Sequence, residues 1–187
     1  MTLTLILGGV RAGKSARALA LADANAPNGR VLFVAAAQAF DDEMKHRIDA
    51  HKRERPVTWT TLESPMTLSR DIADQFQRAR ESYEVVLIDC LTLWTSNILL
   101  SIGEDEDAEQ SVAGHVAELL RLTESSAPAS DAHWIIVSNE VGLGVVPPTP
   151  LGRRYRDALG RANQLVAAAA SDVVLMVAGL ELPLKSR

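Results

Sequence analysis

Short apolar runs alternate with longer amphipathic segments along the chain. The runs rich in Val, Ile and Leu predict buried strands, and they are Leu3–Leu7, Val31–Ala36, Val85–Asp89, Trp134–Ser138 and Val173–Val177. A further segment, Val57–Leu62, is more polar, and we expect it nearer an edge of the sheet.

Apolar side chains at helical spacing predict helices between these strands. The segments are Lys14–Asp23, Asp42–Arg53, Pro65–Arg80, Ala108–Thr123 and Leu151–Ala170. Ser64 followed by Pro65 is typical of a helix start, because Ser caps a helix and Pro suits its first position. Three segments are expected to be irregular: Gly103–Asp107, Ala127–Ala132 and Val141–Pro150.

This alternation predicts an α/β fold with a mostly parallel central sheet and helices on both faces. The length of 187 residues favours one domain over residues 1–187. The net charge of -5 argues against a nucleic-acid partner. Cys90 is the sole cysteine, which fits a reducing compartment. Because the sequence shows neither a secretory pattern nor an apolar stretch of bilayer length, we expect a cytoplasmic protein without a membrane span.

The segment Gly8–Ser15 reads GGVRAGKS and matches the phosphate-loop pattern G-x-x-x-x-G-K-[ST]. It lies between a predicted strand and a predicted helix, as that pattern requires. Glycines let backbone N–H groups turn toward phosphate oxygens, and the helix N-terminus favours an anion. Lys14 is expected to reach the β- and γ-phosphates, and the Ser15 hydroxyl to bind Mg²⁺. A chance glycine-rich turn is the alternative.

Two carboxylates follow predicted strands. Asp89 ends Val85–Asp89, where ligands of α/β proteins bind, so it is expected to hold Mg²⁺ or its water. The alternative for Asp89 is a cap for a helix near Thr92. Glu140 lies at a similar strand end and either orients a nucleophile or binds water.

His51 falls on the apolar stripe of its predicted helix, together with Met44 and Ile48. A neutral imidazole is a competent nucleophile toward phosphorus. The plainer alternative is a histidine at the edge of the core with one hydrogen bond. Basic residues follow at once: Lys52, Arg53 and Arg55. They suit phosphate, but they also suit a solvated helix C-terminus, so the spacing leaves both interpretations open.

These residues make the chain resemble the bifunctional adenosylcobinamide kinase / adenosylcobinamide-phosphate guanylyltransferase family. The resemblance covers nearly the whole chain and is most specific from Asp41–Met44 to His51, and at Asn139–Gly142 within the matching segment Ser138–Gly142. Its other segments are Gly8–Ser15, Phe33–Gln38, Trp59–Glu63, Asp89–Asn97 and Arg153–Asn163.

The resemblance implies phosphorylation of adenosylcobinamide with ATP or GTP, then transfer of GMP from GTP to give adenosylcobinamide-GDP. It also implies Mg²⁺, a RecA-like phosphate-loop fold, a homotrimer, and a guanylylated histidine that matches His51. The residues that it implies in nucleotide binding are Gly8, Gly9, Val10, Arg11, Ala12, Gly13, Lys14, Ser15, Ala36, Ala37, Gln38, Lys52, Arg53, Glu54, Arg55, Glu63 and Asp89.

The chain departs from the family pattern at two positions, where Ala12 and Ala36 each lack a hydroxyl that the pattern usually has. These changes keep open a degenerate relative that lacks one activity. A kinase of single activity with a structural His51 is a second alternative. A nucleotide-dependent switch is a third, although no Asn-Lys-x-Asp segment occurs. Val141–Pro150 and Arg153–Arg154 are expected to form part of the corrinoid surface, or simply a rigid loop.

Overall fold

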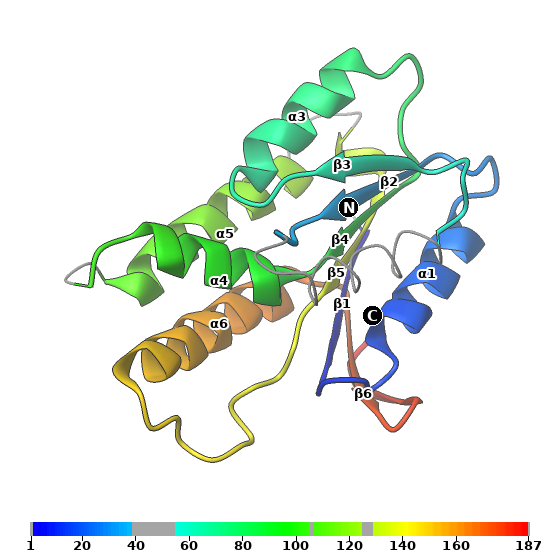
Figure 1. The fold of residues 1–187 in the computed structure, drawn as a ribbon. Helices are drawn as coiled ribbons and strands as arrows, with labels where there is room; N and C mark the ends of the chain where they lie inside the picture. The colour runs from blue at the N-terminus through cyan, green and yellow to red at the C-terminus, as the bar shows by residue number, and fades with distance from the viewer. Residues whose placement is uncertain (1, 39–54, 105–106, 125–128, 187) are drawn as a thin grey trace.

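A computed structural model describes residues 2–38, 55–104, 107–124 and 129–186. These residues form a seven-stranded sheet in the order β3-β2-β4-β5-β1-β6-β7 (Figure 1). The strands are β1 (Thr2–Gly8), β2 (Val31–Ala35), β3 (Thr60–Glu63), β4 (Val85–Asp89), β5 (His133–Val137), β6 (Asp172–Val177) and β7 (Leu180–Lys185). All neighbours pair in parallel except β6 and β7, which are antiparallel.

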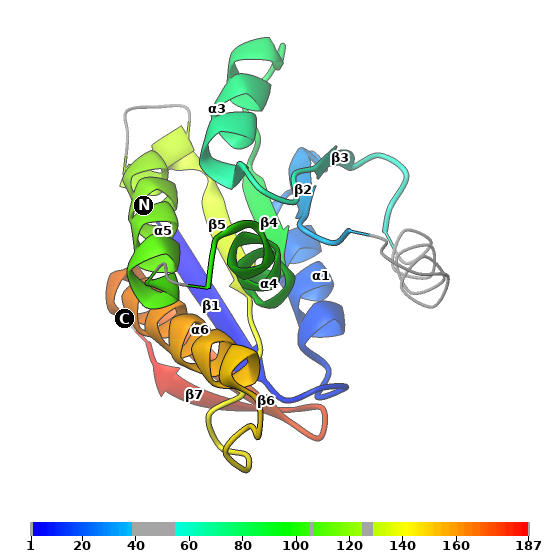
Figure 2. The same ribbon diagram turned by 60° about the vertical axis from the view of Figure 1, so that its left-hand side comes forward.

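The described helices cover both faces of the sheet, as predicted. They are α1 (Lys14–Asn25), α3 (Leu68–Arg78), α4 (Leu91–Ser101), α5 (Ala108–Glu124) and α6 (Pro150–Ala169), with a short 3₁₀ turn at Ala129–Asp131. Helix α1 packs on one face, and α3, α4, α5 and α6 lie together on the other (Figures 1 and 2). The central strands are buried on both sides, which explains why they read as continuous apolar runs.

Two apolar clusters mark these faces. Alternate residues of the central strands, such as Ile6, Phe33 and Leu87, pack with Ala18 and Ala22 of α1. The residues between them pack against the four helices of the other face. Side chains alternate along a strand, so residues two positions apart in a strand point to the same face of the sheet.

The predicted helix start at Ser64–Pro65 is wrong. Helix α3 begins at Leu68, and Thr67 holds the N-cap position. The Ser64 backbone N–H donates to the Ala35 carbonyl (2.9 Å), and its hydroxyl donates to the Asp71 carboxylate (2.7 Å). The segment after β3 therefore continues along β2 for one residue before it turns.

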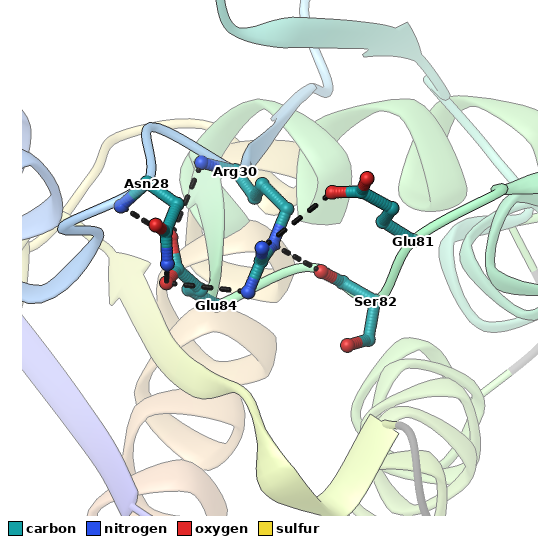
Figure 3. A network of polar contacts seen from close by, with 5 residues as sticks. All are labelled: Asn28, Arg30, Glu81, Ser82 and Glu84. Atoms are coloured by element: carbon teal, nitrogen blue, oxygen red, sulfur yellow. Dashed lines mark hydrogen bonds and ion pairs between the residues drawn. The ribbon is translucent and has the colours of Figure 1, made fainter.

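The opposite end of these strands is held by a polar network between the turn before β2 and the start of β4 (Figure 3). The Glu84 carboxylate accepts hydrogen bonds from the side chain and backbone of Asn28 and from the Arg30 backbone. The Arg30 guanidinium in turn donates to the Ser82 carbonyl at 2.9 Å. These contacts align β2 with β4, so their carboxyl ends, where the candidate site lies, come level.

Within the described ranges, no helix combines the length and apolar character that a bilayer crossing requires.

Candidate nucleotide site

The predicted phosphate loop joins β1 to α1, as its pattern requires. Gly8 has φ 151° and Gly13 has φ 98°, values that side chains disfavour. A Cβ on Gly8 would lie 2.5 Å from the Met176 carbonyl oxygen of β6. Gly13 occupies the N-cap position of α1, so the loop delivers the free N–H groups of that helix to its own concave side.

Lys14 is buried within this loop. The residue is 9% exposed, and its Nζ donates to the Gly9 carbonyl at 2.6 Å. Burial lowers the pKa of Lys14, whereas the neighbouring Cys90 and Asp89 act in the opposite direction. An ammonium held out of water gains more from an entering polyphosphate than one already solvated, because the local dielectric is lower.

The hairpin of β6 and β7 supports the loop from behind, which the sequence did not indicate. The Gly179 backbone N–H donates to the Ala12 carbonyl at 3.0 Å. Arg17 of α1 forms an ion pair with Glu181 of β7. The β6–β7 hairpin therefore holds the loop at Ala12 and the following helix at Arg17.

Three predicted residues, Glu63, Asp89 and Ala36, lie at the carboxyl ends of β3, β4 and β2. Ala35 pairs with both Glu63 and Asp89 across the sheet. The next residue, Ala36, donates its N–H to the Asp89 carbonyl at 3.3 Å and is fully buried. Buried Asn97 of α4 donates to the carbonyls of Ala36 and Pro65, both at 2.9 Å. It therefore fixes the start of the predicted nucleotide segment Ala36–Gln38.

The residues proposed for magnesium fit that ion. Asp89 lies close enough to Lys14 to influence its pKa, and Ser15 follows Lys14 in the first turn of α1. Mg²⁺ takes oxygen ligands and usually needs only one or two from the protein, because phosphates and waters complete its shell. The described residues contain no group of three or more His, Cys, Asp or Glu that would form a closed metal cage. Cys90, rather than Asp89, occupies the N-cap position of α4, which weakens the capping alternative.

A pocket of about 480 Å³ lies beside β3 at the edge of the sheet. Its lining residues are Arg55, Pro56, Val57, Trp59, Thr61 and Glu63. The Arg55 guanidinium stacks over the Phe33 ring at 3.5 Å, on the face that α1 also covers. Arg55 and Glu63, which the resemblance implies in nucleotide binding, therefore share one cavity.

Glu140 lies beside the phosphate loop, whereas four other predicted residues are not described. His51, Lys52, Arg53 and Glu54 lie outside the described residues. Glu140 donates its backbone N–H to the Gly8 carbonyl at 3.2 Å, beside the phosphate loop. Its carboxylate accepts from the Gly142 N–H at 2.6 Å, so it shapes the following turn.

Arg153, expected at a corrinoid surface, donates to the carbonyls of Pro147 and Pro148 at 3.1 and 2.9 Å. This guanidinium therefore stiffens the segment that precedes α6. The exposed apolar side chains of the same segment are Leu143, Val145 and Val146.

Comparison with known proteins shows which family this chain matches. The family model described as "Cobinamide kinase / cobinamide phosphate guanyltransferase" matches residues 4–184. The "Bifunctional adenosylcobalamin biosynthesis protein CobP" of Pseudomonas aeruginosa is 42% identical over 182 residues, covering 97% of this chain and 96% of the relative. The CobU protein of Escherichia coli, described in the same words, is 36% identical over 97% of this chain and 98% of its own length.

Solved structures support the phosphate-loop fold at much lower identity. One of them, described as an ATPase domain, has a TM-score of 0.55 at 15% identity and covers 93% of this chain and 68% of that chain. The flagellar accessory protein FlaH from Methanocaldococcus jannaschii has a TM-score of 0.51 at 13% identity, covering 100% and 79%.

Proposed function

Because this chain belongs to the cobinamide kinase / cobinamide phosphate guanyltransferase family, we propose that it phosphorylates adenosylcobinamide and then guanylylates the product. The first step uses ATP or GTP, and the second moves GMP from GTP to give adenosylcobinamide-GDP and pyrophosphate. The observation that carries this proposal is the family match over residues 4–184, which includes an intact phosphate loop.

In the kinase step, the hydroxyl oxygen of the corrinoid side arm bonds to the γ-phosphorus. The bond from that phosphorus to the β–γ bridging oxygen breaks, the nucleoside diphosphate leaves with the electron pair, and the hydroxyl proton passes to solvent. Lys14 and the loop N–H groups stabilise charge on the transferring group. Ser15 and Asp89 would hold Mg²⁺, which neutralises phosphate charge when bound.

In the guanylyl step, an imidazole nitrogen of His51 attacks the α-phosphorus of GTP, and pyrophosphate leaves. A phosphate oxygen of the corrinoid then attacks that phosphorus, which breaks the nitrogen–phosphorus bond and frees the histidine. The attacking imidazole must be unprotonated, so guanylylation should decline as the pH falls through the pKa of His51. Lys52, Arg53 and Glu54 would lie beside this reaction.

The pocket beside β3 suits a guanine base. The carboxylate of Glu63 accepts hydrogen bonds, and guanine presents two adjacent donors at its N1 and N2 positions. Trp59 and Arg55 line the same cavity, where the Arg55 guanidinium stacks on the Phe33 ring. This pocket would therefore give the second step its preference for GTP.

The assembly and the corrinoid surface are further parts of the proposal. We expect a cytoplasmic homotrimer, on the strength of the family resemblance. The exposed apolar side chains of Leu143, Val145 and Val146 suit the corrin ring. Light scattering on a size-exclusion column tests the trimer, and a monomer of 20.2 kDa would contradict it.

Mass spectrometry tests the covalent step. The intact protein is incubated with GTP and Mg²⁺, then digested to locate any added GMP. The proposal predicts one GMP on the peptide that contains His51 and none in His51→Ala. An adduct that persists in His51→Ala would remove this histidine from the mechanism.

Product analysis separates the rival function, a kinase of single activity. Purified protein is mixed with adenosylcobinamide, GTP and Mg²⁺, and the corrinoid products are followed over time. Adenosylcobinamide phosphate should form first and adenosylcobinamide-GDP second. Accumulation of the phosphate alone would favour the rival.

A further inference from the structure

Asn139 follows β5, and β5 lies between the strand of the phosphate loop and the strand of Asp89. Val137 pairs with Ile6 of β1 on one side and with Asp89 of β4 on the other. Asn139 is two residues further along, in the direction in which β1 leads to Gly8. The register therefore places Asn139 at the level of the phosphate loop, between that loop and the metal-binding carboxylate.

The backbone keeps its strand geometry beyond the assigned end of β5. Ser138 donates its N–H to the Ile6 carbonyl at 3.0 Å, and Glu140 donates to the Gly8 carbonyl at 3.2 Å. These alternate bonds continue the parallel ladder to β1. Residues 138–140 therefore continue the alternation of side chains between the two faces.

Alternation gives the face of Asn139. Ile135 and Val137 belong to the α1 face of the sheet, so Asn139 falls on that face as well. Asp89 shares this parity with Val85 and Leu87 of the same face. Ser138 has the opposite parity, and its hydroxyl donates to Asn163 of α6 at 2.6 Å. The Asn139 side chain is therefore directed to the side of α1, where Lys14 and Ser15 lie.

Side chains replace the strand partner that Asn139 has lost, because β4 ends at Asp89. The Thr92 hydroxyl accepts from the Asn139 N–H at 2.8 Å, and the Asn163 amide donates to the Asn139 carbonyl at 3.0 Å. Thr92, Asn163 and Ser138 are 8%, 6% and 0% exposed. Both backbone groups of Asn139 are thus held by a buried network, while no described residue forms a hydrogen bond with its side-chain amide. This network fixes the backbone of Asn139 and leaves its side-chain amide available to a ligand.

We propose that the Asn139 amide binds the γ-phosphate of the nucleotide and donates a hydrogen bond to a nonbridging oxygen during phosphoryl transfer. This proposal deepens the kinase step proposed above and rests on it. The amide gives up no proton, and its contribution is electrostatic, because the hydrogen bond strengthens as charge builds on the transferring group. A nucleoside diphosphate lacks this phosphate, so Asn139 distinguishes the substrate from the spent product.

The test compares two adenine nucleotides by calorimetry, since adenine nucleotides do not guanylylate the protein. ADP and the β,γ-imido analogue of ATP are titrated with Mg²⁺ into wild type, Asn139→Ala and the nearly isosteric Asn139→Asp. Asn139→Ala should weaken the analogue about tenfold and ADP less than twofold. Asn139→Asp should weaken the analogue further, because a carboxylate repels the γ-phosphate. Asn25→Ala is the matched control, since Asn25 is exposed on the last turn of α1.

Kinase turnover with adenosylcobinamide supplies the second readout. The kcat of Asn139→Ala should fall about 10- to 100-fold. An unchanged ratio of the two dissociation constants in both variants would overturn the proposal, whether both ligands bind normally or both weaken equally. Failure of the wild type to phosphorylate adenosylcobinamide would overturn the proposed function instead, and the binding ratio would still decide the role of Asn139.

Discussion

Single residues in the phosphate loop differ in how much they constrain the backbone. Gly8 has a positive φ and lies against the Met176 carbonyl, whereas the space around Gly9 is open. We therefore predict that Gly8→Ala lowers the free energy of unfolding by about 2–4 kcal/mol, from strain and steric overlap together. Denaturation by urea measures this change. Gly9→Ala is the control and should stay within about 0.5 kcal/mol of wild type; equal effects of the two would contradict the packing described for Gly8.

Cys90 gives a prediction about alkaline pH. Burial, with a smaller effect of Asp89, raises the pKa of its thiol to about 11. The unfolded thiol titrates near 8.5, roughly, so above that pH the unfolded state holds fewer protons than the folded state. This contribution to stability is complete below about pH 8.5 and is lost as the pH rises through about 11.

Cys90→Ser should remove the part of the alkaline loss of stability that the thiol causes. Other groups also titrate in this range, so the quantity to compare is the decline in unfolding free energy for each protein across the same range of pH. Wild type should lose on the order of 3 kcal/mol more than the variant. Parallel curves for the two proteins would show that the thiol is not held protonated by the fold.

Glu63 gives a prediction about specificity. A glutamine keeps the shape of the side chain but offers guanine one acceptor and one unwanted donor. We expect Glu63→Gln to lower kcat/KM for GMP transfer from GTP about tenfold or more, and to leave kcat/KM for ATP in the kinase step within twofold. Steady-state kinetics with each nucleotide measures both. Glu81→Gln, whose parent side chain is 71% exposed, is the control; a parallel loss with ATP and GTP would argue against base recognition.

Among the elements, α4 holds the start of the predicted nucleotide segment through Asn97. Asn97→Leu keeps the volume but leaves the buried carbonyl of Ala36 and the partly buried carbonyl of Pro65 without their donor. We expect a loss of about 2–4 kcal/mol in unfolding free energy. Weaker binding of the β,γ-imido analogue of ATP should accompany it, because Ala36 begins the segment Ala36–Gln38. Asn25→Leu should change neither quantity, and a fully stable Asn97→Leu would contradict this role.

The elements also show what sequence patterns can and cannot predict. The central strands were predictable because burial on both faces makes them apolar throughout. Helix α4 shows no amphipathic period, since seven of its eleven residues are buried. Strand β7 escaped prediction because its residues are all exposed and include Pro183.

The candidate site divides in the same way. The position of Gly8–Ser15 between β1 and α1 and that of Asp89 at the end of β4 were predictable from the sequence pattern. Their roles in binding phosphate and Mg²⁺ stay predictions. Thr92, Asn163 and Gly179 were not, since their roles depend on contacts across 47, 24 and 167 positions of the chain. The roles assigned to His51 and to the residues that follow it stay predictions.

At the scale of the whole molecule, the phosphate loop, Asp89 and Asn139 all lie at the carboxyl ends of the parallel strands. The pocket beside β3 reaches the same end of the sheet at Glu63. Parallel strands deliver their carboxyl ends to the same edge, so residues far apart in sequence meet there. A site of this kind suits two reactions that each consume a nucleoside triphosphate. The single domain over residues 1–187 and the trimer remain predictions at this scale.

The most direct test follows both corrinoid products made by wild type and His51→Ala from adenosylcobinamide, GTP and Mg²⁺. Wild type should form adenosylcobinamide phosphate and then adenosylcobinamide-GDP. The variant should accumulate the phosphate at a similar rate and stop there. Formation of adenosylcobinamide-GDP by His51→Ala at the rate of wild type would contradict the account.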